Sequence, residues 1–127
     1  MNNANRSVFI IHQMHLSSLG QIKLEGLGWE AADPNSPHYD PEIAAYADKS
    51  RGAEKFKPDF WKFYHPAMKV VAKDLDGVFE AGNGYGPLAH EVEKLGKAYS
   101  CSVGDIIQCG GLYWMVDPCG FSEVAIH

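Results

Sequence analysis

Several features that mark common protein classes are missing from this sequence of 127 residues. It has only three cysteines and no Cys-x-x-Cys pair, so neither a disulfide framework nor a structural zinc site is predicted. No apolar run approaches the roughly 18 to 20 residues of a membrane-spanning helix, and no apolar leader follows the first residues. These absences favour a cytoplasmic protein with no membrane association.

Basic charge is scarce as well. The sequence holds 11 lysines and arginines against 16 aspartates and glutamates, which gives a formal charge of −5. This balance provides no general attraction to nucleic acid or to an anionic membrane surface. The chain is long enough for one hydrophobic core but too short for two ordinary domains. We therefore expect a single domain that spans residues 1–127.

Motifs for cofactors, metals and catalysis are also lacking. The glycine-rich residues 82–86 have neither Rossmann nor P-loop spacing. His12 and His15 lie on a predicted strand, where a spacing of three sends their side chains to opposite faces. We therefore expect no cofactor and no metal. Because the sequence does not show which histidine approaches a cysteine, it identifies no catalytic residue and favours a protein that is not an enzyme.

The residues that are present predict an α+β fold, with a mostly antiparallel sheet covered on one face by short helices. Residues 7–14 form a run of strand length that is apolar on both faces, which indicates a central strand. Asp40 and Asp74 are expected to cap helices, because an aspartate before a helix accepts hydrogen bonds from its first N–H groups. The expected helices are residues 40–51, 58–65, 74–79 and 86–95, with a further strand at residues 68–73.

A four-stranded meander is predicted at residues 99–126. The dipeptide Gly110-Gly111 separates two β-rich runs and accepts the positive φ angles of a type I′ hairpin turn. Gly104-Asp105 and Gly120 are expected in the other two turns. Because a side chain would strain the first of these turns, Gly104→Val is expected to lower stability by about 1 to 3 kcal/mol.

The meander carries a resemblance to a known family. The pattern Ser102-Val103-Gly104-Asp105, then Tyr113, Val116-Asp117, and Gly120-Phe121 with Glu123-Val124 resembles the C-terminal signature of YodL-like small domains. These largely uncharacterised domains belong to proteins of phages, plasmids and conjugative elements. The similarity extends upstream to residues 74–79 and covers roughly residues 68–124. It implies a mobile-element origin and no particular activity.

Residues 15–39 are expected to be irregular and to form a recognition surface. They combine large apolar residues with turn formers, a composition too apolar for an idle linker. Trp29 is the first candidate binding residue, with Trp61 the second, because large aromatics carry much of the energy at protein interfaces. If Trp29 is instead a core residue, its truncation should cost stability rather than binding.

The leading functional hypothesis is a non-enzymatic accessory protein of a mobile element that binds another, unidentified protein. A small nucleic-acid-binding domain is the alternative, which the acidic charge does not favour. A small hydrolase or transferase comes third. Self-association into a homo-oligomer also stays open.

Overall fold

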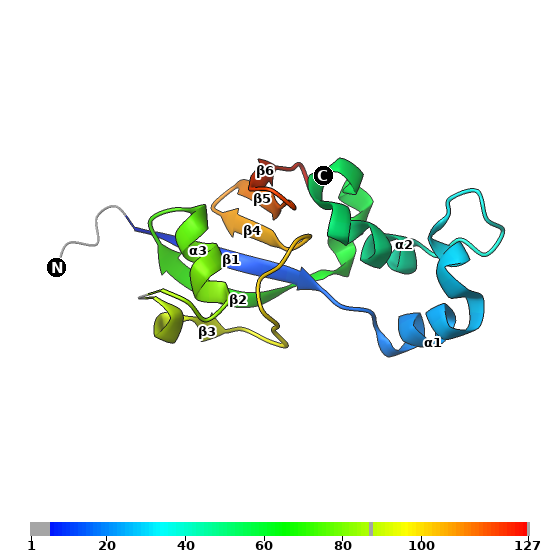
Figure 1. The fold of residues 1–127 in the computed structure, drawn as a ribbon, viewed down its shortest axis with the longest axis horizontal. Helices are drawn as coiled ribbons and strands as arrows, with labels where there is room; N and C mark the ends of the chain where they lie inside the picture. The colour runs from blue at the N-terminus through cyan, green and yellow to red at the C-terminus, as the bar shows by residue number, and fades with distance from the viewer. Residues whose placement is uncertain (1–5, 87, 127) are drawn as a thin grey trace.

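The computed structural model describes residues 6–86 and 88–126, and its framework is a single antiparallel sheet (Figure 1). The α+β fold predicted from the sequence is confirmed. The strands, in the spatial order β3-β2-β1-β4-β5-β6, are β1 (Ser7–Met14), β2 (Tyr64–Ala72), β3 (Glu93–Lys94), β4 (Ile106–Cys109), β5 (Leu112–Val116) and β6 (Phe121–Glu123).

The helices in the described residues are short. Asp40 caps α2 by accepting hydrogen bonds from the backbone N–H groups of Glu42 and Ile43, and Asp74 caps α3 in the same way through Gly77, as predicted. The α-helices are α1 (Ser18–Leu27), α2 (Pro41–Asp48) and α3 (Leu75–Gly82), and the 3-10 helices are η1 (Gly28–Ala32), η2 (Lys49–Lys55), η3 (Pro58–Phe63) and η4 (Ala89–Glu91).

The first strand is central, as its apolar faces predict. β1 pairs with β2 along its whole length, from Ser7 opposite Ala72 to Met14 opposite Tyr64, and with β4 on its other edge. The pairing with β2 shifts register between Ile11 and His12. Both edges of β1 are therefore paired. The C-terminal end of β1 lies on the side of the sheet where α1 and α2 are found.

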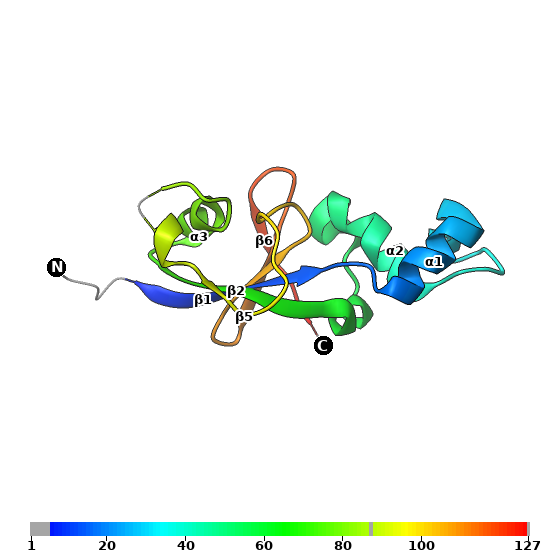
Figure 2. The same ribbon diagram turned by 90° about the horizontal axis from the view of Figure 1, so that it is seen from below.

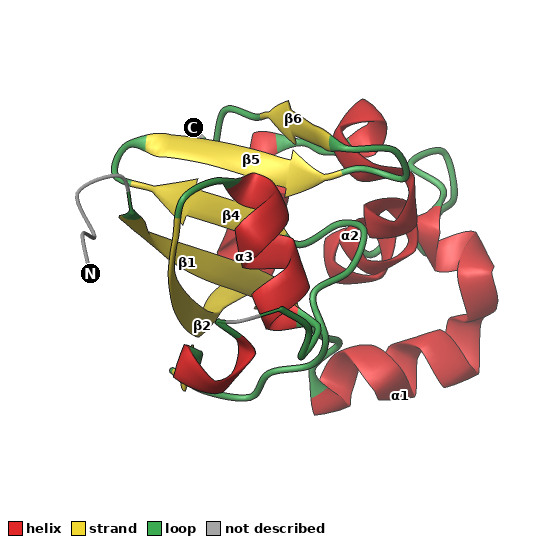
Figure 3. Ribbon diagram, turned by 60° about the vertical axis from the view of Figure 1, so that its left-hand side comes forward, coloured by secondary structure: helices red, strands yellow, loops and turns green. Residues whose placement is uncertain are grey.

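Two hydrophobic clusters hold the helices to the sheet. In the larger one, Val78 of α3 packs against a face of the sheet that includes Ile11 and Val70, and Figures 2 and 3 show α3 lying across that face. In the smaller one, Ala45 of α2 and Phe60 of η3 enclose Met14 at the end of β1. The α1–α2 region is thus attached at the end of the sheet rather than over its face.

The C-terminal meander forms, but with three strands, since residues 99–102 are not a strand. The Gly110-Gly111 turn also differs from the prediction. Only Gly110 has a positive φ, +59°, which is the pattern of a type II′ turn rather than type I′. The turn before β4 has Gly104 at φ +93° and a hydrogen bond from the Asp105 N–H to the Ser102 carbonyl. Gly120 has φ +89° in the last turn.

Two predicted helices are wrong. Residues 58–63 form only a 3-10 helix, because Tyr64 already pairs with Met14 as the first residue of β2. Residues 86–95 contain η4 and β3, because Glu93 and Lys94 extend the sheet by pairing with β2, while Leu88 and Val92 pack on the larger cluster. Pro87, the expected first residue of that helix, lies outside the described residues.

The prediction of an irregular segment at residues 15–39 is wrong for residues 18–32, which form α1 and η1, whereas residues 33–39 contain turns and no helix or strand. Ser17 caps α1 by accepting a hydrogen bond from the Gly20 N–H, and the Glu42 carboxylate accepts bonds from both the N–H and the hydroxyl of Ser17. These polar contacts hold α1, with Gly20 as its only buried residue. Across the described residues, no helix has the length and apolar character needed to cross a membrane.

Candidate functional site

The first candidate surface is the apolar helix face, which we define as Leu19 and Ile22 of α1 and Trp29 of η1. Their side chains are 60%, 65% and 58% exposed. Gly20 turns toward the Glu42 carboxylate, where an added Cβ would lie 2.6 Å from Oε1, so helical spacing directs Leu19 and Ile22 away from the molecule. Figure 1 shows α1 at the end of the molecule opposite the start of β1.

Trp29 is held in place without being buried. Its indole lies parallel to the Tyr46 ring of α2, with an interplanar angle of 5° and 6.4 Å between ring centroids. The large exposed fraction shows that Trp29 does not fill a core position within this chain. A fixed, exposed indole has the geometry of a binding anchor, since little side-chain freedom is left to lose.

Trp61 lies on a different part of the surface and is half-buried. Its ring is 4.7 Å from His12 and 5.3 Å from Tyr113, measured between centroids, and it stacks on Tyr64. No aromatic contact joins Trp61 to Trp29 among the described residues. The structure therefore does not bring the two predicted binding residues together.

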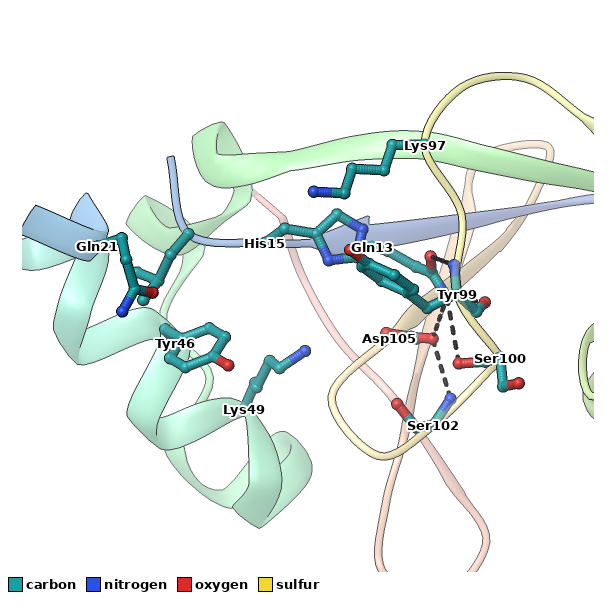
Figure 4. Close-up of a pocket in the computed structure, with 11 residues that line it drawn as sticks. Gln13, His15, Gln21, Tyr46, Lys49, Lys97, Tyr99, Ser100, Ser102 and Asp105 are labelled. Carbon is teal, nitrogen blue, oxygen red and sulfur yellow. Dashed lines mark hydrogen bonds between the residues drawn. The ribbon is translucent and has the colours of Figure 1, made fainter. Parts of the chain in front are cut away.

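The second candidate is a polar cleft of about 350 Å³ at the junction of sheet and helices (Figure 4). The end of β1, the C-terminal end of α2 and the segment of residues 97–102 form its walls. We call it the polar cleft. The lining side chains that matter for its chemistry are His15, Tyr46, Lys49, Lys97, Tyr99 and Asp105.

Gln13 builds the wall of the polar cleft between β1 and β4. This buried side chain exchanges two hydrogen bonds with the Tyr99 backbone, accepting from its N–H at 2.9 Å and donating to its carbonyl at 2.8 Å. It also donates to Asp105 Oδ2 at 2.9 Å, and the Ser102 N–H donates to the same oxygen at 3.0 Å. Residues 99–105 are thereby fixed to β1 without strand pairing.

Asp105 is the one acidic side chain in that wall, and the wall disfavours the ionised form of its carboxyl group. Burial raises its pKa to about 6, against the opposing effect of the hydrogen bonds from Gln13 and the Ser102 backbone and of the Lys49 charge. Its Oδ2 is already occupied by those two donors. Asp105 thus serves mainly to hold the turn, and it offers little negative charge to the cleft at mildly acid pH.

Basic groups dominate the rest of the cleft. Lys49 lies over the Tyr46 ring at 5.5 Å and donates to the Met14 carbonyl at 3.3 Å, and Lys97 lies over the Tyr99 ring at 5.4 Å. Neither lysine forms an ion pair with a carboxylate in the part of the chain that the structure describes.

His15 stands between these groups. The pKa of its imidazole is lowered by burial and then by the nearby His65, Lys49 and Lys97, and a hydrogen bond to the Lys97 backbone partly offsets this. Its Nε2 is buried and has no hydrogen-bond partner among the described residues. Its ring meets the Tyr99 ring edge to face at 4.5 Å.

Cys101 is not placed to act as a nucleophile. Cys101 is buried, and burial together with the nearby Asp105 carboxyl raises the pKa of its thiol, which disfavours the nucleophilic thiolate. Cys109 is half-buried beside the hairpin turn and Cys119 is exposed. Among the described residues, no group of three or more histidine, cysteine or acidic side chains is arranged to hold a metal ion. The expectation that the protein needs no metal stays a prediction.

No family model, curated protein or solved structure matches the chain. The resemblance to YodL-like domains therefore stays a prediction, and functional inference rests on the geometry. Of the residues predicted from sequence, Asp105 lines the polar cleft, and Gly104, Gly110, Gly111 and Gly120 lie in the predicted turns outside it. Sequence reasoning missed the cleft because its basic residues come from separate segments that carry no motif.

Proposed function

We propose that this protein acts by binding another protein through the apolar helix face, without catalysing a reaction. The observation that carries the proposal is the exposure of Leu19 and Ile22 on α1 and of Trp29 on the adjoining η1, since none of the three is buried by the fold. Isolated exposed apolar residues are common, but three large ones within residues 19–29 of one projecting region are typical of an interaction surface.

The shape of the face supports one mode of binding. A convex helix that projects from the end of the molecule fits a groove in its partner better than it fits a flat surface. Leu19 and Ile22 are spaced as helical anchors, and Trp29 adds the largest apolar area. Glu25 is exposed one turn after Ile22, which favours a partner groove with an apolar floor and a basic rim.

A mobile genetic element is the setting that we propose for this interaction. The support is the resemblance of residues 68–124 to domains of phage, plasmid and conjugative-element proteins. In that setting the chain would be an accessory protein whose α1–α2 end contacts another component of the element.

Site-specific photocross-linking tests the proposal. A benzophenone amino acid replaces Ile22 in one protein and Leu112 in a matched control. Leu112 is also an exposed leucine, at 49%, but it lies at the start of β5. After irradiation in cells of the organism that encodes the chain, the residue-22 probe should give an adduct of defined mass that the residue-112 probe does not give.

A second variant ties the adduct to the proposed anchor. Adding Trp29→Ala to the residue-22 probe should remove most of the adduct, because loss of a hot-spot aromatic weakens binding by about 2 kcal/mol, or roughly 30-fold. The partner identified by mass is then purified, and its dissociation constant for wild type and variant is measured. Equal adducts from both probe sites, or a product of twice the chain mass only, would overturn the proposal.

A further inference from the structure

We propose that the polar cleft binds the phosphate group of a small molecule, with Lys49, Lys97 and His15 as its cationic ligands. This site shares no residue with the apolar helix face, although Tyr46 of its lining stacks on Trp29, and it does not depend on the protein-binding proposal. The three side chains reach the cleft from the residue after β1, from the start of η2 and from the segment of residues 97–102, which are far apart in the sequence (Figure 4).

The charge of the cleft opposes that of the whole molecule. A chain with a formal charge of −5 places two lysines, Lys49 and Lys97, in the lining of this cleft together with the ionisable His15. Asp105 is the only carboxylate in the lining, and its Oδ2 already accepts two hydrogen bonds. Gathering like charges in a partly enclosed site is unfavourable without a counter-charge, which an anionic ligand would supply.

His15 gives independent support for an absent ligand. A buried ring nitrogen without a hydrogen-bond partner is rare in native proteins, because leaving it unpaired costs free energy. Because Nε2 is closed to solvent, the ring would have to turn for this nitrogen to donate to an anion beside Lys49 and Lys97. The anion would also offset the nearby His65, Lys49 and Lys97, which after burial are the causes that lower the pKa of His15.

The types of side chain suit a phosphate group. Lysine binds phosphate as a point charge that can donate to any of its peripheral oxygens, and a protonated histidine adds a single donor. Ser102 and Tyr99 supply further polar and aromatic surface. A volume of about 350 Å³ admits phosphate and a small organic group attached to it.

Nuclear magnetic resonance of the His15 ring tests the site directly. The ring resonance is followed from pH 5 to pH 8 at constant ionic strength, without and with inorganic phosphate, and His15→Gln assigns it. Phosphate should move the titration midpoint of His15 upward by about one pH unit, because a nearby opposite charge stabilises the imidazolium. His38 lies on an exposed segment outside the cleft, and its resonance should not respond.

The pH dependence of affinity follows from the same groups. The titratable or charged side chains around His15 are His65, Lys49, Lys97, Tyr99 and Asp105. Binding should weaken as the pH rises through the His15 midpoint of the complex, because the deprotonated imidazole no longer carries a charge for the anion. Phosphate gains negative charge over the same pH range. Calorimetric titration at pH 6 and pH 8 is therefore run on wild type and on His15→Gln, and the difference in pH dependence between the two proteins measures the contribution of the imidazole.

Charge-matched variants supply the control. Lys97→Gln should weaken phosphate binding by about tenfold, the value of one charge-assisted hydrogen bond. Lys94→Gln makes the same charge change on β3, outside the cleft, and should alter affinity less than twofold, as expected for a screened surface charge. Both residues are exposed, so neither variant should disturb the fold.

The ligand series separates the possible sources of phosphate. Phenyl phosphate binding more tightly than inorganic phosphate would identify an organic monoester as the ligand, and equal or weaker binding would identify free phosphate. Both results support the site. An unchanged His15 midpoint, an equal shift with acetate, or equal losses in the Lys97 and Lys94 variants would overturn it.

Discussion

Gly104 offers the sharpest test of the fold, because two separate physical effects meet at one residue. Its φ of +93° lies in a region that residues with side chains rarely adopt. In addition, a Cβ atom added to Gly104 would lie 2.5 Å from the carbonyl oxygen of Lys49 and 2.6 Å from the Cβ atom of Lys49. Gly120 has nearly the same φ, +89°, but open space around its Cβ position. The pair therefore separates backbone strain from steric contact.

The magnitudes can be worked from these contacts. Forcing alanine into a left-handed conformation costs about 1 to 2 kcal/mol, so Gly120→Ala should lose about that much stability. Gly104→Ala carries the same cost plus about 1 to 3 kcal/mol for overpacking against Lys49, or about 2 to 5 kcal/mol in all. The sequence-based value for Gly104→Val included only turn strain, and a valine should cost more than an alanine here.

Urea unfolding followed by tryptophan fluorescence measures both variants. The expected result is a lower midpoint for Gly104→Ala than for Gly120→Ala, with unchanged dependence on urea concentration. The Gly104 backbone cannot move away easily, because the Gly104 N–H donates to the Val116 carbonyl and the Gly104 carbonyl accepts from the Tyr64 hydroxyl. Equal losses of stability in the two variants would refute the reasoning.

Three further predictions follow from buried and exposed groups. Trp29→Ala should lower the free energy of unfolding by less than about 1.5 kcal/mol, since only its stacking on Tyr46 is lost, and a larger loss in a melting experiment would make Trp29 a core residue. The Asp105 carboxyl has a pKa of about 6 in the folded state and of 3.8 in the unfolded chain. Between pH 3.8 and pH 6 the folded state therefore binds more protons than the unfolded state. Stability should therefore fall by roughly 3 kcal/mol as the pH rises from about 4 to about 6, and Asp105→Asn should remove this dependence from urea unfolding. Added zinc or a chelator should leave the melting temperature unchanged, and a shift of several degrees with stoichiometric metal would contradict the prediction of no metal site.

Local chemistry explains which elements could be predicted from the sequence. The caps at Asp40 and Asp74 act within three residues, and the turns at Gly104 and Gly120 are fixed by their own φ angles, so neighbouring residues suffice to identify them. The hairpin was placed correctly for the same reason, although the structure showed which turn type Gly110 adopts.

Long-range pairing explains the misses. Residues 88–95 have helical periodicity, yet Glu93 and Lys94 pair with β2, which no local pattern reveals. Conversely, α1 contains two glycines and directs Leu19 and Ile22 outward, so it lacks the apolar stripe that marks a helix packed on a core.

The polar cleft was missed for a related reason. In the sequence, His15 is only one of two histidines that are three residues apart. Lys49 and Lys97 have no distinguishing pattern, and only the fold places them beside His15. No sequence pattern indicates the role of Gln13, because its side chain forms hydrogen bonds with the backbone of Tyr99, 86 residues further along the chain. The sequence left open whether Trp29 is exposed or a core residue, and the structure shows it 58% exposed, while its role in binding stays a prediction.

The central place of β1 has a consequence for how the protein is made. β1 ends at Met14, and the strand that covers its second edge, β4, begins at Ile106, about 90 residues later. At about 5 to 20 residues per second, a ribosome needs roughly 5 to 20 s to synthesise that interval. Throughout this time an apolar strand keeps one edge of unpaired backbone groups, which can pair with another nascent chain. The centre of the finished sheet is thus an open edge for most of translation, and slower initiation or lower temperature should raise the soluble yield.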